Sequence, residues 1–380
     1  MWSFHEYFAG GGMARAGLGP QWQCLFANDI DVKKTTAYAQ NWGSDALVCG
    51  DVARLAPSDI PGRADLAWAS FPCQDLSVAG AGAGLKGQRS GTFWAFWTQI
   101  QALVAQGRAP KTLVLENVCG TLTSHRGADF TAICAALAGS GYRFGAIVVD
   151  AALFLPHSRP RLFIIALSRD MAIPAGVRGE PSPLWHTGAV HAAYARLSAE
   201  MSNAWVWWHM PPPVQLRLRF ADIAEKDAEA CNWHSPQATK SLLAKMSVGN
   251  LAKVEMARQA LARRIGTVYK RTRLDENGAK VQRAEVRFDG LAGCLRTPGG
   301  GSSLQTILVV EQGTVKSRLI SARETARLMG LPETYRLPPN YNDAYHLTGD
   351  GVVVPVVRHL ASHILEPILE GADQASKVAA

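Results

Sequence analysis

The sequence lacks the patterns that mark several large classes of protein. Its seven cysteines are dispersed and contain no C-x-x-C pair, which argues against a zinc ribbon or a disulfide framework. No apolar stretch approaches the roughly eighteen residues that span a bilayer. The start, Met1–Glu6, lacks the basic and apolar regions of a signal peptide. We therefore expect a cytoplasmic protein with no membrane association and no metal.

Charged residues are also few, at 18% of the chain against 48% hydrophobic residues, which favours a well-packed enzyme over a disordered chain. A length of 380 residues favours two domains. Lysine and arginine number 39 against 31 acidic residues, for a net charge of +8. That excess permits a polyanionic partner such as nucleic acid but does not require one.

The first 169 residues alternate short apolar runs with helix-like segments. The predicted strands are His5–Ala9, Cys24–Asn28, Asp65–Ala69, Thr112–Glu116, Ala146–Asp150 and Arg161–Leu167. The segments with helical spacing between them are Val32–Asn41, Thr92–Gln106 and Phe130–Ala138. This alternation predicts an α/β fold, a doubly wound and mostly parallel sheet, over residues 1–169. Ligands of such sheets bind at the carboxyl ends of the strands.

The amino-acid composition and the hydrophobic pattern change after residue 170. Prolines and a tryptophan cluster come first, residues 240–296 are rich in lysine and arginine, and a glycine-serine turn follows at 298–303. Regular patterns return with a predicted helix at Ala322–Gly330 and an apolar run at Gly351–Leu360. We predict a smaller, irregular second domain over residues 170–317, and a C-terminal segment, 318–380, that returns to the first domain.

A glycine-rich turn, Phe8-Ala9-Gly10-Gly11-Gly12, follows the first predicted strand. Glycines let a backbone turn tightly and approach a ligand closely, although such turns are as often structural. Asp29 ends the second strand, where these folds bind ribose hydroxyls, and Asp51 follows a third apolar run. Both acids have a second interpretation as helix caps.

Three further patterns carry reactive side chains. Phe71-Pro72-Cys73-Gln74 follows a strand beside glycine-rich sequence, so Cys73 is either an exposed nucleophile or a buried apolar filler. Glu116-Asn117-Val118 ends an apolar strand, where a partly desolvated carboxyl suits proton donation. In Arg159-Pro160-Arg161 the two arginines point the same way on an extended chain.

The order and spacing of these blocks carry more information than any one of them. F-x-G-x-G, then P-C-Q, E-N-V and R-x-R, then a variable region, closely resembles the DNA (cytosine-5)-methyltransferase family, of the prokaryotic modification type. The tail segment Arg323–Gly330 looks like the family's late R-E-x-A-R-L-x-G block. The resemblance covers roughly residues 4–167 and 290–365. It implies the S-adenosylmethionine-dependent methyltransferase fold with a target-recognition domain at 170–317.

The resemblance also implies roles for single residues. Cys73 would be the nucleophile and Glu116 the proton donor to the base, with Asn117 holding the Cys73 loop and with Arg159 and Arg161 contacting the base and the thiolate region. The S-adenosyl-L-methionine site would be lined by Phe8, Gly10, Gly12, Asp29, Asp51 and Pro72. The expected DNA contacts are Gln74, Arg89, Ser90 and Arg296.

The implied partner is double-stranded DNA, which makes the expected location nucleoid-associated, and the target cytosine would be flipped out of the helix. We expect a monomer, and the family type allows a cognate restriction endonuclease as a further partner. The chain departs from the family pattern at His157, usually Gln, and at Asp350, usually Asn.

Two alternatives share most of these residues. A tRNA cytosine-5 methyltransferase would use the same P-C-Q and E-N-V chemistry, but the long basic region favours duplex DNA. A catalytically silent DNA-binding paralogue is disfavoured by the intact Cys73, Glu116 and Arg161. A nucleotide-binding oxidoreductase is disfavoured because the glycine pattern lacks G-x-G-x-x-G.

Overall fold

A computed structural model describes residues 1–72, 92–214, 218–226, 232–260, 262–274, 276–296 and 304–378. The chain divides into two compact units. The first unit comprises Met1–Asp150, Pro160–Val214 and Val352–Ala380, and the second comprises Ala151–Arg159 and Gln215–Gly351.

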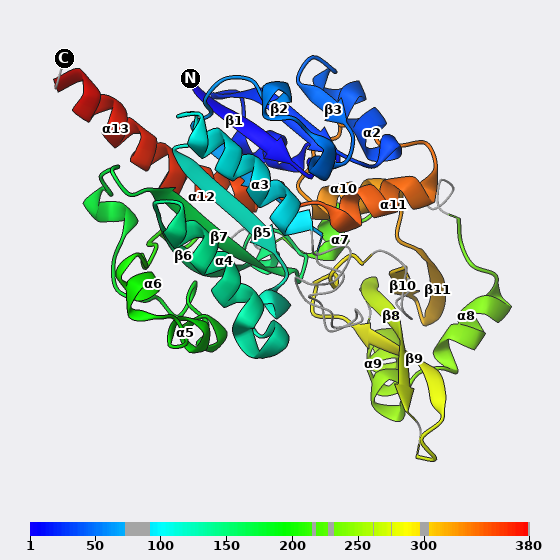
Figure 1. Cartoon of the computed structure of the whole chain (residues 1–380). Helices are drawn as coiled ribbons and strands as arrows, with labels where there is room; N and C mark the ends of the chain where they lie inside the picture. Colours follow the sequence, from blue (N-terminus) through cyan, green and yellow to red (C-terminus); the bar gives the residue numbers. More distant parts are fainter. Residues whose placement is uncertain are drawn as a thin grey trace. The chain divides into compact units, whose positions relative to one another are not determined.

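The first unit is built on a seven-stranded sheet (Figure 1). Its strands are β1 (Trp2–Tyr7), β2 (Trp22–Asp29), β3 (Leu47–Cys49), β4 (Leu66–Ala69), β5 (Thr112–Asn117), β6 (Tyr142–Asp150) and β7 (Pro160–Ser168). They lie in the order β3-β2-β1-β4-β5-β7-β6, and β7 runs antiparallel to both of its neighbours. The mostly parallel, doubly wound sheet is thereby confirmed, with β3 as an addition to the six predicted strands.

The helices of the first unit include the three that the sequence predicts, α2 (Val32–Trp42), α3 (Thr92–Ala105) and α4 (Ala128–Gly139). The others are α1 (Met13–Leu18), α5 (Gly188–Tyr194), α6 (Ala199–Asn203), α12 (Val354–Leu360) and α13 (Glu366–Val378), with a π-helical turn at Ala361–Leu365. Helix α1 was not predicted because six residues are too few to show a helical period.

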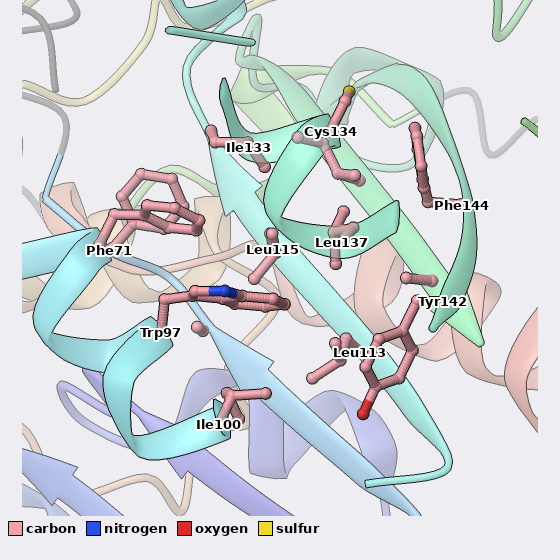
Figure 2. Packing of buried hydrophobic residues seen from close by; sticks show 14 of the residues in the cluster. Phe71, Trp97, Ile100, Leu113, Leu115, Ile133, Cys134, Leu137, Tyr142 and Phe144 are labelled. Atoms are coloured by element: carbon pink, nitrogen blue, oxygen red, sulfur yellow. The ribbon is translucent and has the colours of Figure 1, made fainter. Parts of the chain in front are cut away.

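The main apolar core of this unit fixes β5. Figure 2 shows Trp97 and Ile100 of α3 and Leu137 of α4 directed at Leu113 and Leu115 of β5. All five side chains are buried. Each fully buried side chain of this size stabilises the fold by about 1.5–3 kcal/mol, so the carboxyl end of β5 has a rigid support.

Residues 170–214 belong to the first unit, which differs from the predicted boundary at 170. Trp208 is fully buried and its Nε1 donates to the Ile165 carbonyl of β7 at 3.1 Å. A Cβ built on Gly145 of β6 would lie 1.8 Å from the Val206 carbonyl, so this segment packs directly on the sheet. The tryptophan cluster therefore packs within the first unit.

The second unit contains a four-stranded antiparallel sheet, with strands β8 (Arg264–Leu274), β9 (Lys280–Arg287), β10 (Thr306–Glu311) and β11 (Thr314–Leu319) in the order β11-β10-β8-β9. Its helices are α7 (Phe220–Ile223), α8 (Pro236–Leu243), α9 (Val248–Gln259), α10 (Ala322–Leu328) and α11 (Tyr341–Asp350). Leu242 of α8 and Val254 of α9 pack with Val268 and Val286 on one face of the sheet. This region is thus more regular than predicted.

The second boundary also differs, since the second unit runs to Gly351 rather than 317. The physical link is an ion pair between Arg318 of β11 and Glu324 of α10, with an Nη2–Oε1 distance of 2.6 Å and both side chains buried. Separating β11 from α10 would leave two buried charges without each other. Asp350 is exposed and is the last residue of α11, whereas the N-cap of α12 is Val353, so Asp350 does not cap α12.

One helical stretch of the described residues, Tyr341–Ala372, is long and apolar enough to cross a membrane by length and composition. Of its most apolar window, 61% is buried inside the protein, as in the core helix of a soluble protein.

Candidate active site

The middle of the first sheet is the point where the strand order reverses. β1 pairs in parallel with β2 on one side and with β4 on the other. Ligands of open α/β sheets bind at the carboxyl ends of the strands at such a point. The glycine turn follows β1, and Phe71-Pro72 follows β4. Two of the predicted motifs therefore meet at the position that the fold favours for a ligand.

Asp29 organises the glycine turn. The Gly10 N–H donates to Asp29 Oδ2 at 2.8 Å, and the Asp31 N–H donates to Asp29 Oδ1 at 2.9 Å. Gly10 has φ +54°, and a Cβ built on it would meet no atom within 4 Å, so open space lies beside the backbone. The carboxylate thus ties the ends of β1 and β2 together and leaves the turn open on the side where a ligand would lie.

Phe8 and Gly12 fix the shape of this turn. Phe8 has φ +56°, a conformation that costs a non-glycine residue free energy and is concentrated at functional sites. Gly12 has φ +76°, and a Cβ there would lie 2.4 Å from Nε1 of Trp42. That indole donates to the Gly11 carbonyl at 3.0 Å. Only glycine fits at position 12.

Glu6 of β1 lies beside the turn and was not predicted. Its side chain is buried, Oε1 accepts a hydrogen bond from the Arg15 N–H at 3.4 Å, and burial raises the pKa of the carboxyl to about 8. No sequence pattern distinguishes it from an exposed glutamate on a strand. Asp51, by contrast, caps the 3-10 turn Val52–Arg54 by accepting from the Ala53 N–H at 3.0 Å, so its cap interpretation is observed.

Glu116, Asn117 and Arg161 come together at the carboxyl end of β5. Arg161 Nε lies 3.3 Å from Glu116 Oε1, and the side chains are 16% and 7% exposed. Asn117 Nδ2 donates to the Phe71 carbonyl at 3.1 Å, and Asn117 Oδ1 accepts from the Val118 N–H at 2.8 Å. Asn117 therefore holds the chain two residues before Cys73.

Pro72 is half-buried and is the last described residue before a gap in the described chain. The predicted nucleophile and three predicted DNA contacts lie outside the described residues; they are Cys73, Gln74, Arg89 and Ser90.

Arg159 and Arg296 belong to the second unit. Arg159 is buried and donates to the main-chain carbonyls of Leu295 at 3.0 Å and of Gly349 and Gly351 at 2.8 Å each. Arg296 is exposed at the end of the same segment. The two arginines of the R-x-R block thus make different contacts, Arg159 with carbonyls and Arg161 with Glu116.

His157, which stands where the family usually has Gln, is fully buried in the second unit. Its Nε2 accepts from the Leu295 N–H at 3.2 Å, so Nδ1 donates to the Leu328 carbonyl at 3.0 Å. A neutral imidazole donates once and accepts once, as an amide side chain can. The substitution therefore retains a side chain that bridges two parts of the main chain.

Comparison with protein families decides the identity of this arrangement. The family model of the C-5 cytosine-specific DNA methylases matches residues 2–366. The chain belongs to this family. It is accordingly a DNA cytosine-5 methyltransferase by family, and S-adenosylmethionine is the family's methyl donor.

The curated relatives are modification enzymes. The chain is 25% identical to the Type II methyltransferase M.HhaI of Haemophilus parahaemolyticus, over 95% of this chain and 93% of the relative. It is 24% identical to the Type II methyltransferase M.DsaV of Dactylococcopsis salina, over 96% and 86%. The crystal structure of the S. pombe Dnmt2 methyltransferase matches with a TM-score of 0.60 and 17% identity, over 97% of this chain and 99% of that chain, which shows the shared fold.

Proposed function

We propose that this methyltransferase transfers a methyl group from S-adenosylmethionine to C5 of a cytosine in a specific duplex DNA sequence. The reaction proceeds on a flipped-out base through a covalent bond between Cys73 and C6. The observation that carries the proposal is the cluster at the end of β5, where Glu116 is paired with Arg161 and Asn117 holds Phe71 beside the Cys73 segment.

The chemistry requires these residue types. C5 of cytosine is a poor nucleophile until the Cys73 thiolate adds to C6 and converts C5 into an enamine carbon. Glu116 promotes that addition by donating a proton or a strong hydrogen bond to N3, which makes C6 more electrophilic. Arg161, whose Nε lies 3.3 Å from Glu116 Oε1, orients the carboxyl group, and its guanidinium stabilises the charge that develops on the O2 side of the base.

Methyl transfer to C5 is followed by elimination of the thiolate. When bound, S-adenosylmethionine supplies an electrophilic methyl group. C5 takes this methyl as the methyl–sulfur bond breaks, then loses its own proton to a base. The electrons of that C–H bond restore the C5–C6 double bond and expel the Cys73 thiolate. The proton on N3 returns to Glu116, which brings the enzyme back to its starting state.

The residues around the glycine turn fit the cofactor. The open space beside Gly10 admits a ligand close to the backbone, and Asp29 fixes the turn at the carboxyl ends of β1 and β2. Phe8, Gly12 and Pro72 shape the same end of the sheet, and we propose that they line the cofactor site. Asp51 would act there through the 3-10 turn that it caps.

The sequence predicts that residues 170–317 recognise the target. We assign recognition to residues 215–317, the part of that segment that lies in the second unit. The basic residues of this part, Arg296 among them, would contact phosphates of the DNA backbone. A cognate restriction endonuclease remains part of the proposal because the curated relatives are Type II methyltransferases.

Bisulfite sequencing tests the proposal directly. Plasmid DNA from a methylation-deficient bacterial host that expresses the chain should resist conversion at one cytosine of a short recurring sequence. DNA from the same host expressing Cys73→Ala should convert fully. Complete conversion in both samples, with the protein folded and abundant, would contradict the proposed reaction.

A further inference from the structure

The strand pair β8–β9 of the second unit carries a polar groove of about 420 Å³. Its charged lining residues are Lys253, Arg271, Glu285 and Arg287. Lys253 comes from α9, which Figure 1 shows beside β9. The groove therefore offers several strong hydrogen-bond donors on a regular sheet rather than on a loop.

The strand register brings the key side chains to one face. Residues 269, 271 and 273 of β8 alternate onto this face, and Tyr269 is paired with Glu285 of β9. Glu285 binds two arginines of β8, with Oε2 3.3 Å from Arg271 Nε and Oε1 2.7 Å from Arg273 Nη2. One carboxylate thus fixes the orientation of two neighbouring guanidinium groups.

The groove is rigid where it meets the backbone. A Cβ built on Gly293 would lie 2.3 Å from the ring of Tyr269, so the chain at this glycine packs directly on the ring. The Tyr269 hydroxyl donates to the Cys294 carbonyl. Arg287 is fixed as well, since its Nε donates to Asp289 Oδ1 at 2.8 Å.

The charge balance distinguishes two kinds of ligand. Arg271 and Arg273 share the negative charge of Glu285, and Arg287 is paired with Asp289. The carboxylate beside each of these three arginines weakens its attraction for a phosphate, but it leaves the N–H donors able to bind neutral acceptors. Arginines that are fixed and partly neutralised in this way suit the edge of a base better than the DNA backbone.

Guanine has the matching edge. In the major groove it presents two acceptors, O6 and N7, whereas adenine presents one acceptor and one donor. An arginine held at Nε keeps two terminal nitrogens for a bidentate contact. The paired cytosine presents its N4 amino group, from which Glu285 can accept a hydrogen bond.

We propose that Arg271, held by Glu285, reads one guanine of the target sequence through O6 and N7. This assignment rests on the proposed function, because it names a specificity-determining residue for the same reaction. Arg271 and Glu285 are 44% and 36% exposed, so substitutions at either position leave the apolar core of the sheet intact.

The test uses 7-deazaguanine, which lacks the N7 acceptor, at each guanine of the mapped target in turn, on either strand. We expect the wild-type enzyme to lose about tenfold to hundredfold in kcat/KM at one position, the scale of one bidentate contact. Arg271→Ala should be slower on the normal duplex and indifferent to the analogue at that position. Glu285→Gln should show a reduced sensitivity at the same position.

Arg283→Ala is the matched control. Arg283 is an exposed arginine on β9 that pairs with Arg271 of β8 in the strand register, but it does not line the groove. This variant should keep the full sensitivity to the analogue. Two outcomes overturn the assignment. One is a wild-type enzyme that tolerates the analogue at every guanine. The other is an Arg271→Ala enzyme that keeps every sensitivity while its binding falls uniformly and its salt dependence weakens by about one ion, which is the signature of a phosphate contact. Failure of the proposed function would be visible separately, as a wild-type enzyme that methylates no duplex.

Discussion

Arg161 Nε lies 3.3 Å from Glu116 Oε1, and the two residues stand on the neighbouring antiparallel strands β7 and β5. The reversal of β7 produces this pair. Because β7 begins where β5 ends, the first residues of one strand face the last residues of the other. The single antiparallel strand of the sheet thus delivers an arginine to the carboxyl edge, where the ligands of such folds bind.

Replacing Glu116 by Gln should slow methylation by about two orders of magnitude or more, the usual effect of losing a positioned general acid. The amide retains the shape of the side chain but cannot donate a carboxyl proton. Single-turnover kinetics on a mapped duplex would measure the effect. Glu311→Gln, at an exposed strand end of the second unit, is the control and should match wild type. Wild-type rates for Glu116→Gln across neutral pH would remove Glu116 from the mechanism.

Replacing Cys73 by Ala should abolish methyl transfer and leave DNA binding largely intact, because affinity rests on phosphate and groove contacts. A duplex with 5-fluorocytosine at the target should trap a covalent adduct with the wild-type protein, since fluorine cannot leave as the proton does. Denaturing gel electrophoresis would show the adduct. An adduct of equal yield with Cys73→Ala would place the nucleophile elsewhere.

The glycine turn gives a test with a matched control. Gly12 and Gly43 both have positive φ, but a Cβ at Gly12 collides with Trp42 while a Cβ at Gly43 meets nothing within 4 Å. Both alanine variants should lose about 1–2 kcal/mol from backbone strain. Gly12→Ala should lose about 1–3 kcal/mol more from overpacking, and should bind S-adenosylmethionine more weakly. Denaturant unfolding and calorimetry would measure the two effects. Equal behaviour of the two variants would exclude a shaping role for Gly12.

Glu6 predicts a pH dependence of stability. Its carboxyl has an ordinary pKa of 4.5, and burial raises the pKa to about 8 in the folded protein. The folded state therefore binds this proton more tightly than the unfolded state. The stabilising contribution is complete below about pH 4.5 and is lost as the pH rises through 8. Glu6→Gln, which cannot ionise, should lose less stability than wild type between pH 5 and 9. If the free energy of unfolding changed equally with pH in the two proteins over that range, Glu6 would not be a buried acid.

Target choice should follow the second unit. A chimera that carries a relative's segment in place of residues 215–317 should methylate the relative's sequence, because the proposed catalytic residues Glu116, Asn117 and Arg161 remain unchanged in the first unit. Sequencing of bisulfite-treated plasmid DNA would identify the site. Retention of the original site by a folded, active chimera would contradict our assignment of recognition.

The sequence predicted the strands of the first sheet well because their apolar runs are buried on both faces. It also predicted the Glu116 and Asn117 positions, since both follow directly from the end of such a run. β3 was missed as a strand because three residues show no period, and the sheet of the second unit was missed because β8 and β9 carry many charged residues on one face.

The site details that the sequence did not predict depend on tertiary contacts. Glu6 reads as an ordinary strand residue, and only the packing of α1 and β2 around it reveals a buried acid. Arg159 and Arg161 are two residues apart, and the start of β7 at Pro160 separates a buried arginine bound to carbonyls from one that faces Glu116. Local pattern cannot distinguish them because the difference arises from segments almost two hundred residues further along the chain.

The close contact between α1 and α12 has a consequence for biosynthesis. A Cβ on Gly17 would lie 2.4 Å from Cβ of Val357, and Trp22 Nε1 donates to Glu366 Oε1 at 2.9 Å, so the helix that follows the glycine turn packs against the last elements of the chain. Ribosomes add about 5–20 residues per second. The end of the first unit that carries the glycine turn thus lacks this packing partner until the ribosome has added Val357 and Glu366. A nascent chain that stops before residue 352 leaves the buried face of α1 exposed to water. Chaperones or proteases can then bind that apolar surface.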